Sequence, residues 1–292
     1  SNIVLMGECM VEFGSAGKPG LYRQKFAGDV FNTAIYIKRC VKDATKVQFL
    51  SAVGNDSLSD QMIALMDDES VDSSLLYRST SAQMGLYLIK VDDDGERSFT
   101  YWRDTSAAKQ VVELLKNDGG CSRLADSDIF FFSGISIAIL SPQDRTQLWQ
   151  YISELKAGGT KIVFDPNYRP TLWASLDETR TSYAQAFSLA DVALPGVDDH
   201  MVLYDAKNAE DVADFLEQLG VNEIIIKNGA AGMLVSVNGE RSYIDVDPVK
   251  KVVDTTSAGD AFNGGYLSAR IIGRSVQQAA VFASKVSACV IQ

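Results

Sequence analysis

Short apolar runs recur along the chain, with polar, helix-like stretches between them. Six runs have the length of a β-strand, and most are rich in β-branched residues or Phe: residues 3–6, 47–52, 129–132, 161–164, 192–194 and 223–226. Unbroken apolar runs of this length are typical of strands that are buried on both faces, as in a parallel sheet.

The stretches between these runs have helical periodicity. The clearest are residues 32–40, 59–69, 145–157, 178–188 and 209–219. In the last of them, Val212, Phe215, Leu216 and Leu219 fall on one helical face. Strands alternating with helices predict an α/β fold with a doubly wound, mainly parallel sheet of the Rossmann type.

Two segments break this alternation. Residues 10–26 and 84–102 look like β-hairpins, and in the second the runs 84–91 and 97–102 flank a polar turn that contains Gly95. We therefore predict a small antiparallel sheet outside the core, formed by about residues 10–26 and 84–103. It is either a solvent-facing edge or a lid over a cleft. No repeat or Pro-rich linker divides the chain, so we expect one domain over residues 1–292.

Composition removes several classes of function. The chain has 292 residues and a net charge of −11, which disfavours nucleic-acid binding. Its only histidine, His200, excludes multi-histidine metal sites. The four cysteines form no CxxC pair, and such scattered thiols are typical of a reduced, cytoplasmic protein. No apolar run is long enough to cross a membrane, and the chain starts directly with a strand pattern, so we expect no signal peptide.

The strongest chemical signal is the string Asp254-Thr255-Thr256-Ser257-Ala258-Gly259-Asp260. It lies between a strand-like run, 251–253, and a helix-like run, 261–271, so its backbone N–H groups are free to bind an anion. Phosphate would repel the Asp260 carboxylate unless that group takes up a proton. We interpret Asp260 as the general base that deprotonates an attacking hydroxyl. The alternative is a helix cap.

These residues resemble a known family. Residues 254–262 resemble the C-terminal signature of the PfkB, or ribokinase-like, carbohydrate kinases, and residues 27–32 resemble their N-terminal signature. Residues 165–169 and 227–232 match further segments in the right order. The resemblance implies a Rossmann-like domain with a small β lid that transfers the γ-phosphate of ATP, with Mg²⁺, to a sugar hydroxyl. A glycine-rich dinucleotide fingerprint and a P-loop are both absent, which disfavours an oxidoreductase and excludes a P-loop kinase.

Within the family, the chain is most similar to the kinases that act on 2-keto-3-deoxygluconate. The similarity lies in residues 7–12, 32–37, 101–103 with 106–108, and 290–292. The family usually continues past this last stretch, so we expect the chain to stop short of the family's full length.

A sugar acid carries a carboxylate, and two arginines follow predicted strands. Arg103 ends a hairpin strand and Arg169 comes just after the run 161–164, so both could hold the carboxylate at the strand ends. Each could instead form an ordinary surface ion pair. The resemblance points to Tyr87 and Tyr101 as lid residues that touch the sugar, the alternative being cross-strand packing.

The two signatures supply the remaining candidates. Gly28, Asp29 and Asn32 would bind the sugar, although Asp29 could simply cap the following helix. The N–H groups of Ser257, Ala258 and Gly259 would stabilise the phosphoryl group. The resemblance places ATP near Asn167, Lys227, Gly229 and Gly232. The two glycines could also form a hairpin turn before residues 233–237.

Three departures from the family pattern stand out. Ala27 and Ser257 occupy positions where the family has glycine. In the segment that the family uses for divalent ions, only the final acidic residue is kept, as Asp198. We therefore expect no dedicated protein site for Mg²⁺, which ATP oxygens and water would hold.

The sequence thus predicts ATP-dependent phosphorylation of the terminal hydroxyl of 2-keto-3-deoxygluconate, with Asp260 as base. The alternatives are a neutral-sugar kinase, such as a fructokinase, and a non-catalytic sugar sensor on the same scaffold. The expected partners are the sugar acid and ATP, without nucleic acid or membrane. A homodimer or larger homo-oligomer could form through the small sheet.

Overall fold

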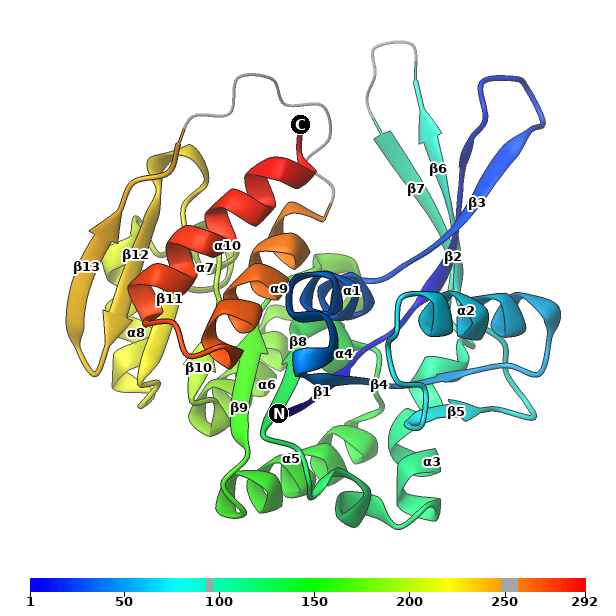
Figure 1. Ribbon diagram of the computed structural model, residues 1–292, viewed down its shortest axis with the longest axis horizontal. Helices are drawn as coiled ribbons and strands as arrows, with labels where there is room; N and C mark the ends of the chain where they lie inside the picture. The colour runs from blue at the N-terminus through cyan, green and yellow to red at the C-terminus, as the bar shows by residue number, and fades with distance from the viewer. Residues whose placement is uncertain (93–96, 248–256) are drawn as a thin grey trace.

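The computed structural model describes residues 1–92, 97–247 and 257–292 (Figure 1). Within them, nine strands form a large sheet in the order β13-β12-β11-β10-β9-β8-β1-β4-β5. The strands are β1 (Asn2–Met6), β4 (Lys46–Val53), β5 (Leu76–Arg78), β8 (Ile129–Ser133), β9 (Lys161–Asp165), β10 (Val192–Ala193), β11 (Glu223–Lys227), β12 (Met233–Val237) and β13 (Glu240–Ile244).

The sheet is parallel from β5 to β11, and the hairpin β12–β13 adds two antiparallel strands at one edge. All six predicted strands are confirmed, whereas β5 and β13 were not predicted. Strand β1 lies between β8 and β4, where the order of strands along the chain reverses. In open α/β sheets, ligands bind at the carboxyl ends of the strands beside such a reversal.

Helices cover both faces of the large sheet. On one face lie α1 (Asp29–Val41), α2 (Ser57–Asp68), α9 (Ala258–Ile271) and α10 (Val276–Val290). The other face is covered by α3 (Val111–Asn117), α4 (Gly134–Ala138), α5 (Pro142–Ala157), α6 (Leu176–Leu189), α7 (Val197–Tyr204) and α8 (Ala209–Gln218). Strand β1 contributes to both cores, with Ile3 and Leu5 in the first and Val4 and Met6 in the second. No helix in the described part of the chain is long and apolar enough to cross a membrane.

The predicted helices are confirmed, and polar caps explain where several of them begin. The Asp56 carboxylate accepts hydrogen bonds from the N–H groups of Leu58 and Ser59, so α2 starts at Ser57, two residues before the predicted start. Ser175 caps α6 and Asn208 caps α8 in the same way.

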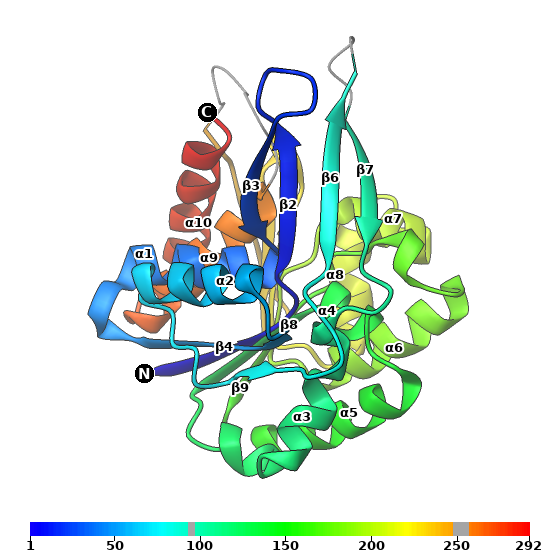
Figure 2. The ribbon, with the colours of Figure 1, turned by 90° about the vertical axis from the view of Figure 1, so that its right-hand side faces the viewer.

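Two hairpins form a separate small sheet, which stands above the large one in Figures 1 and 2. Its order is β3 (Tyr22–Ala27), β2 (Met10–Ser15), β6 (Leu86–Val91) and β7 (Arg97–Trp102). Each hairpin is antiparallel, as predicted, while β2 and β6 pair in parallel where the two hairpins meet. Both leading strands run outward from the core, which makes their directions equal. The predicted turn at residues 93–96 lies outside the described residues.

The chain passes between the two sheets at four places: residues 7–9, 28, 79–85 and 103–106. Backbone hydrogen bonds hold the third of these segments, residues 79–85, in place. The N–H of Val11 in β2 donates to the carbonyl of Gly85 at 2.9 Å, and that of Ala107, just after the last segment, donates to Gln83 at 2.8 Å.

Candidate active site

A central cavity of about 1230 Å³ lies between the small sheet and the carboxyl ends of the large sheet. Most of the predicted site residues line it: Gly28, Asp29, Asn32, Tyr87, Tyr101, Arg103, Asn167, Arg169, Lys227, Ser257, Ala258, Gly259 and Asp260. The fold therefore brings the two signatures, the tyrosines and the arginines to one place, as the topology of the sheet requires.

The N-terminus of α9 forms one wall of this cavity. Ser257 is the N-cap residue, with a φ of 63° in the left-handed region, where glycine is favoured. Its hydroxyl accepts a hydrogen bond of 3.0 Å from the Asn32 amide. The N–H groups of the first turn have no partner in their own helix, so they can bind an anion. Residues 251–256, which carry the start of the signature, lie outside the described residues.

Asp260 is the third residue of α9 and is not its N-cap, so the cap interpretation was wrong. Its carboxylate instead accepts a hydrogen bond of 2.9 Å from Asn32 on α1. Burial raises the pKa of Asp260 to about 8, and the negative charges of Asp29 and Asp165 add to the rise, while the Asn32 hydrogen bond and Lys227 oppose it. A carboxylate with so high a proton affinity is suited to accept a proton.

The N-terminal signature has both structural and site-lining roles. Gly28 is the N-cap of α1, and a Cβ there would lie 2.0 Å from the Glu8 carbonyl oxygen, so only glycine fits. Asp29 is the first residue of the helix, and the suggestion that it caps the helix was wrong. Its carboxylate accepts a hydrogen bond of 2.9 Å from Asn167, and burial raises the pKa of Asp29.

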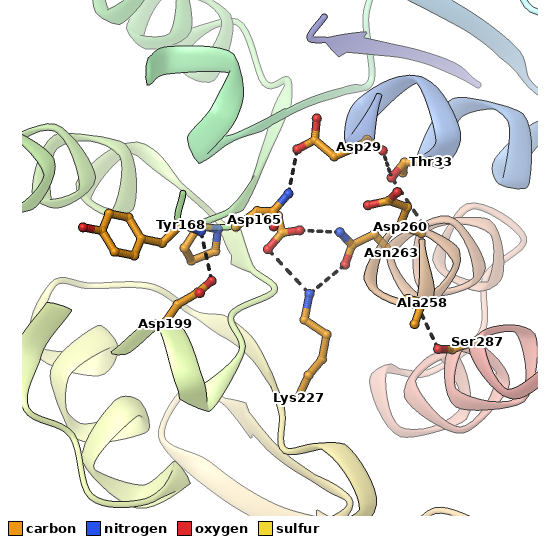
Figure 3. Close-up of polar contacts among 12 residues, drawn as sticks. Asp29, Thr33, Asp165, Tyr168, Asp199, Lys227, Ala258, Asp260, Asn263 and Ser287 are labelled. Carbon is orange, nitrogen blue, oxygen red and sulfur yellow. Dashed lines mark hydrogen bonds and ion pairs between the residues drawn. The ribbon is translucent and has the colours of Figure 1, made fainter. Parts of the chain in front are cut away.

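Three polar residues, of which Asp165 and Asn263 are buried, join the strand ends to α9, as Figure 3 shows. Asp165 ends β9 and accepts a hydrogen bond of 2.6 Å from the Asn263 amide. Lys227 ends β11, with its ammonium 3.5 Å from Asp165 and 3.3 Å from the Asn263 carbonyl oxygen. No role was predicted for Asp165 and Asn263. Their sequence positions could have indicated a role, because each is a polar residue within an otherwise apolar segment.

The two arginines have different surroundings. Arg103 is largely buried and forms an ion pair with Glu8, which is only 2% exposed and also accepts a hydrogen bond of 2.5 Å from Ser106. Arg169 is exposed, and its guanidinium donates to the backbone carbonyl of Tyr168 at 2.9 Å. The charge of Arg103 is therefore largely balanced within the protein. Glu8 was not predicted, although an acidic residue directly after a buried strand could have indicated it.

The tyrosines of the small sheet lie opposite each other. Tyr87 and Tyr101 are cross-strand partners, with ring centroids 5.6 Å apart, so the packing role is observed. The Tyr87 hydroxyl donates to Glu12, whereas Tyr101 remains 49% exposed. The exposed ring presents an apolar face and a hydroxyl to the cavity.

A side cavity of about 580 Å³ adjoins the first and holds the remaining candidates, Gly229 and Gly232. They lie in the turn of the β11–β12 hairpin, as the turn interpretation predicted. A Cβ at Gly232, whose φ is 91°, would lie 2.5 Å from the Ile244 carbonyl oxygen. Lys227, Ala258 and Gly259 line both cavities, so they mark the boundary between them.

Comparison with known proteins agrees with this geometry. The profile of the pfkB family carbohydrate kinases matches residues 1–292. The chain belongs to the pfkB family of carbohydrate kinases.

Two relatives with similar sequences share one name. The 2-dehydro-3-deoxygluconokinase of Escherichia coli (strain K12) is 42% identical over 99% of this chain and 94% of its own length. The protein of that name from Dickeya dadantii (strain 3937) is 40% identical over 100% and 94%. Among solved structures, a PfkB protein from Polaromonas sp. JS666 has a TM-score of 0.86 and 27% identity over 98% of this chain and 94% of that one.

The acidic residue expected from the family's divalent-ion segment is displaced in this pfkB kinase. Asp198 is exposed and is not among the residues that line the central cavity, whereas Asp199 is. The Asp199 carboxylate accepts a hydrogen bond of 3.1 Å from the N–H of Tyr168, and burial raises its pKa. The described residues contain no group of three or more His, Cys, Asp or Glu that could hold a metal ion.

Proposed function

We propose that this carbohydrate kinase transfers the γ-phosphoryl group of ATP to the terminal hydroxyl of 2-keto-3-deoxygluconate. The product is 2-keto-3-deoxy-6-phosphogluconate. The observation that carries the proposal is the position of Asp260, a carboxylate of raised pKa beside the free N–H groups of α9 on the wall of the central cavity. The choice of substrate is supported by the names of the relatives at 40–42% identity.

The sugar acid would bind in the central cavity and the nucleotide in the side cavity. Arg169, whose charge is more available than that of Arg103, would be the main partner of the sugar carboxylate. Tyr87 and Tyr101 would contact the carbon chain from above. The small sheet would act as a lid that excludes water and so limits the hydrolysis of ATP.

In the reaction, the terminal hydroxyl oxygen forms a bond to the γ-phosphorus as the bond between that phosphorus and the bridging oxygen of ADP breaks. Asp260 accepts the hydroxyl proton. The N–H groups of Ser257, Ala258 and Gly259 stabilise the charge of the transferring phosphoryl group. The nucleotide would enter as its Mg²⁺ complex, with the ion held by ATP oxygens and water.

A panel of sugars tests the proposal. Release of ADP is measured with ATP and 2-keto-3-deoxygluconate, its galactonate-type epimer or fructose. The highest kcat/KM is expected for one of the two sugar acids. Faster turnover of fructose would favour the neutral-sugar kinase. Heat of sugar binding in a calorimeter without ADP release would favour the sensor.

A further inference from the structure

Lys227 occupies an unusual position between the two cavities. It lines the central cavity, which holds Asp260, and the side cavity, which holds the glycines of the hairpin turn. A cation at this boundary faces the place where the last phosphate of a nucleotide must meet a hydroxyl. A lysine there is useful only if its flexible side chain is held, because an ammonium on four methylenes loses much rotamer freedom when it is fixed.

Two other residues hold it. The ammonium lies 3.5 Å from Asp165 and 3.3 Å from the Asn263 carbonyl oxygen, and the Asn263 amide donates to Asp165 at 2.6 Å. The three side chains thus form a closed triangle (Figure 3). Asp165 and Asn263 are 4% and 1% exposed, so these contacts are largely shielded from water.

The triangle also connects to the helix that carries the base. Asn263 follows Asp260 by three residues on α9, so both side chains lie on the same side of the helix. Asp165 raises the proton affinity of Asp260 through its negative charge, while Lys227 lowers it. Among the described residues, Asp29 and Asn32 of α1 also act on Asp260, and the Tyr36 hydroxyl of the same helix interacts with its charge.

We propose that Asp165 and Asn263 are positioning residues, which fix the Lys227 ammonium at the boundary of the two cavities and set its distance from Asp260. The inference rests on the proposed phosphoryl transfer. In this proposal the three residues have two roles. They hold a cation where it can face the phosphate, and their charges adjust the proton affinity of the base, Asp260. A purely structural ion pair would do neither.

The test compares Asp165→Asn, which keeps the shape of the side chain, with Lys227→Met, which keeps an apolar stem. Each variant is expected to lower kcat by about tenfold to a hundredfold, since a small misplacement of a reacting group costs this much. Sugar affinity should change little. The acid limb of the kcat/KM profile should move to lower pH in Asp165→Asn, which loses a negative charge, and to higher pH in Lys227→Met, which loses a positive one.

Glu223→Gln is the matched control. Glu223 also joins β11 to α9, at the other end of the strand, through an ion pair of 2.9 Å with Arg270 and a hydrogen bond of 2.5 Å from Tyr266. We expect it to lower the melting temperature while leaving kcat and the acid limb in place. The inference is overturned if the control loses kcat to the same extent, or if the acid limbs of the two test variants do not move in opposite directions.

The assay uses whichever sugar the wild-type protein phosphorylates fastest. A preference for a neutral sugar would therefore refute the proposed substrate while the test of the triangle proceeds with that sugar. The two failures are distinguishable, because one is measured on the wild type alone and the other on the difference between variants.

Discussion

The two sheets of this protein differ in what covers them. In the large sheet, helices pack on both faces, and β8 is buried from its second residue to its last. In the small sheet, β7 is exposed along its whole length, and Phe99, Tyr101 and Trp102 are all among the exposed large side chains. Burial of apolar area stabilises the first, whereas the second has aromatic surface still available for contact. The large sheet is thus packed on both faces, whereas the small sheet leaves aromatic side chains exposed.

The site residues follow the same division. Those carried by the core, such as Asp260 and Asp165, are held by hydrogen bonds to side chains of other elements. Tyr101, on the small sheet, is half exposed. Arg103 is intermediate between these two groups, because it directly follows β7 and is paired with buried Glu8. Chemistry would therefore be sensitive to the core, and substrate recognition to both regions.

The largest effect is expected at Asp260. The Asp260→Asn variant keeps the shape of the side chain but cannot accept the hydroxyl proton, so kcat should fall by about 10²–10⁴-fold. Sugar affinity, measured by calorimetry, should be nearly unchanged. Near-normal turnover in this variant would remove Asp260 from the role of base.

A pair of phenylalanine truncations compares the two sheets directly. Phe164 of β9 is 0% exposed and Phe99 of β7 is 46% exposed. Phe164→Ala should lower the free energy of unfolding by about 3–5 kcal/mol, because it leaves a cavity in the core. Phe99→Ala should cost about 1 kcal/mol or less, since much of its ring already contacts water. Urea titration measures both, and equal losses would contradict the division drawn above.

The two arginines should separate stability from recognition. Arg103→Ala leaves Glu8 buried without its partner, which should cost about 3–5 kcal/mol of stability. Arg169→Ala should leave stability nearly unchanged. It should raise KM for the sugar acid by about tenfold to a hundredfold, the value of a charged hydrogen bond. If Arg169→Ala leaves KM unchanged, the proposed carboxylate contact is wrong.

The smallest effect concerns the loss of folding stability at acidic pH. We expect a core residue to contribute to it, because His200, the only histidine of the chain, packs against Phe187 of the core. Burial lowers the pKa of His200 from 6.5 to about 4, and the backbone of Gly196 opposes this change only in part. As the pH falls below 6.5, the unfolded chain therefore takes up this proton first, and folding is weakened until about pH 4. Above 6.5 both states are neutral and the contribution is constant.

At pH 5 this effect should amount to roughly 2 kcal/mol. Denaturant titrations at pH 7 and pH 5 measure it, with His200→Phe as the control that keeps an aromatic ring. The variant should lose less stability on acidification than the wild type. Identical losses would show that other groups dominate.

The sequence allowed the large sheet to be predicted because its strands are continuous apolar runs, a pattern that burial on both faces imposes. It did not predict β5, which has only three residues, or the parallel pairing of β2 with β6. The pairing of two segments that are 75 residues apart depends on where each of them leaves the core. The local sequence pattern contains no information on that position.

The site shows the same limit. The signatures located Asp260, Asn32 and Lys227, because their spacing is local and specific. Several buried partners in the site were not predicted, among them Asp165 and Asn263 beside Lys227, and Glu8 beside Arg103. Glu8 meets Arg103 across 95 residues and Asp165 meets Asn263 across 98, so their roles became visible only in the folded protein. The left-handed backbone conformation of Ser257 was likewise not predicted. The glycine that the family usually has at this position could have indicated it, because glycine adopts this conformation readily.

The four chain crossings at the base of the small sheet have a consequence for turnover. Each hairpin is tethered at both of its ends, and the β2–β6 ladder joins one hairpin to the other. A movement of one hairpin would therefore involve the other through this ladder. If the small sheet opens and closes the central cavity, a substitution that stiffens one crossing should slow the binding of substrate and the release of product together.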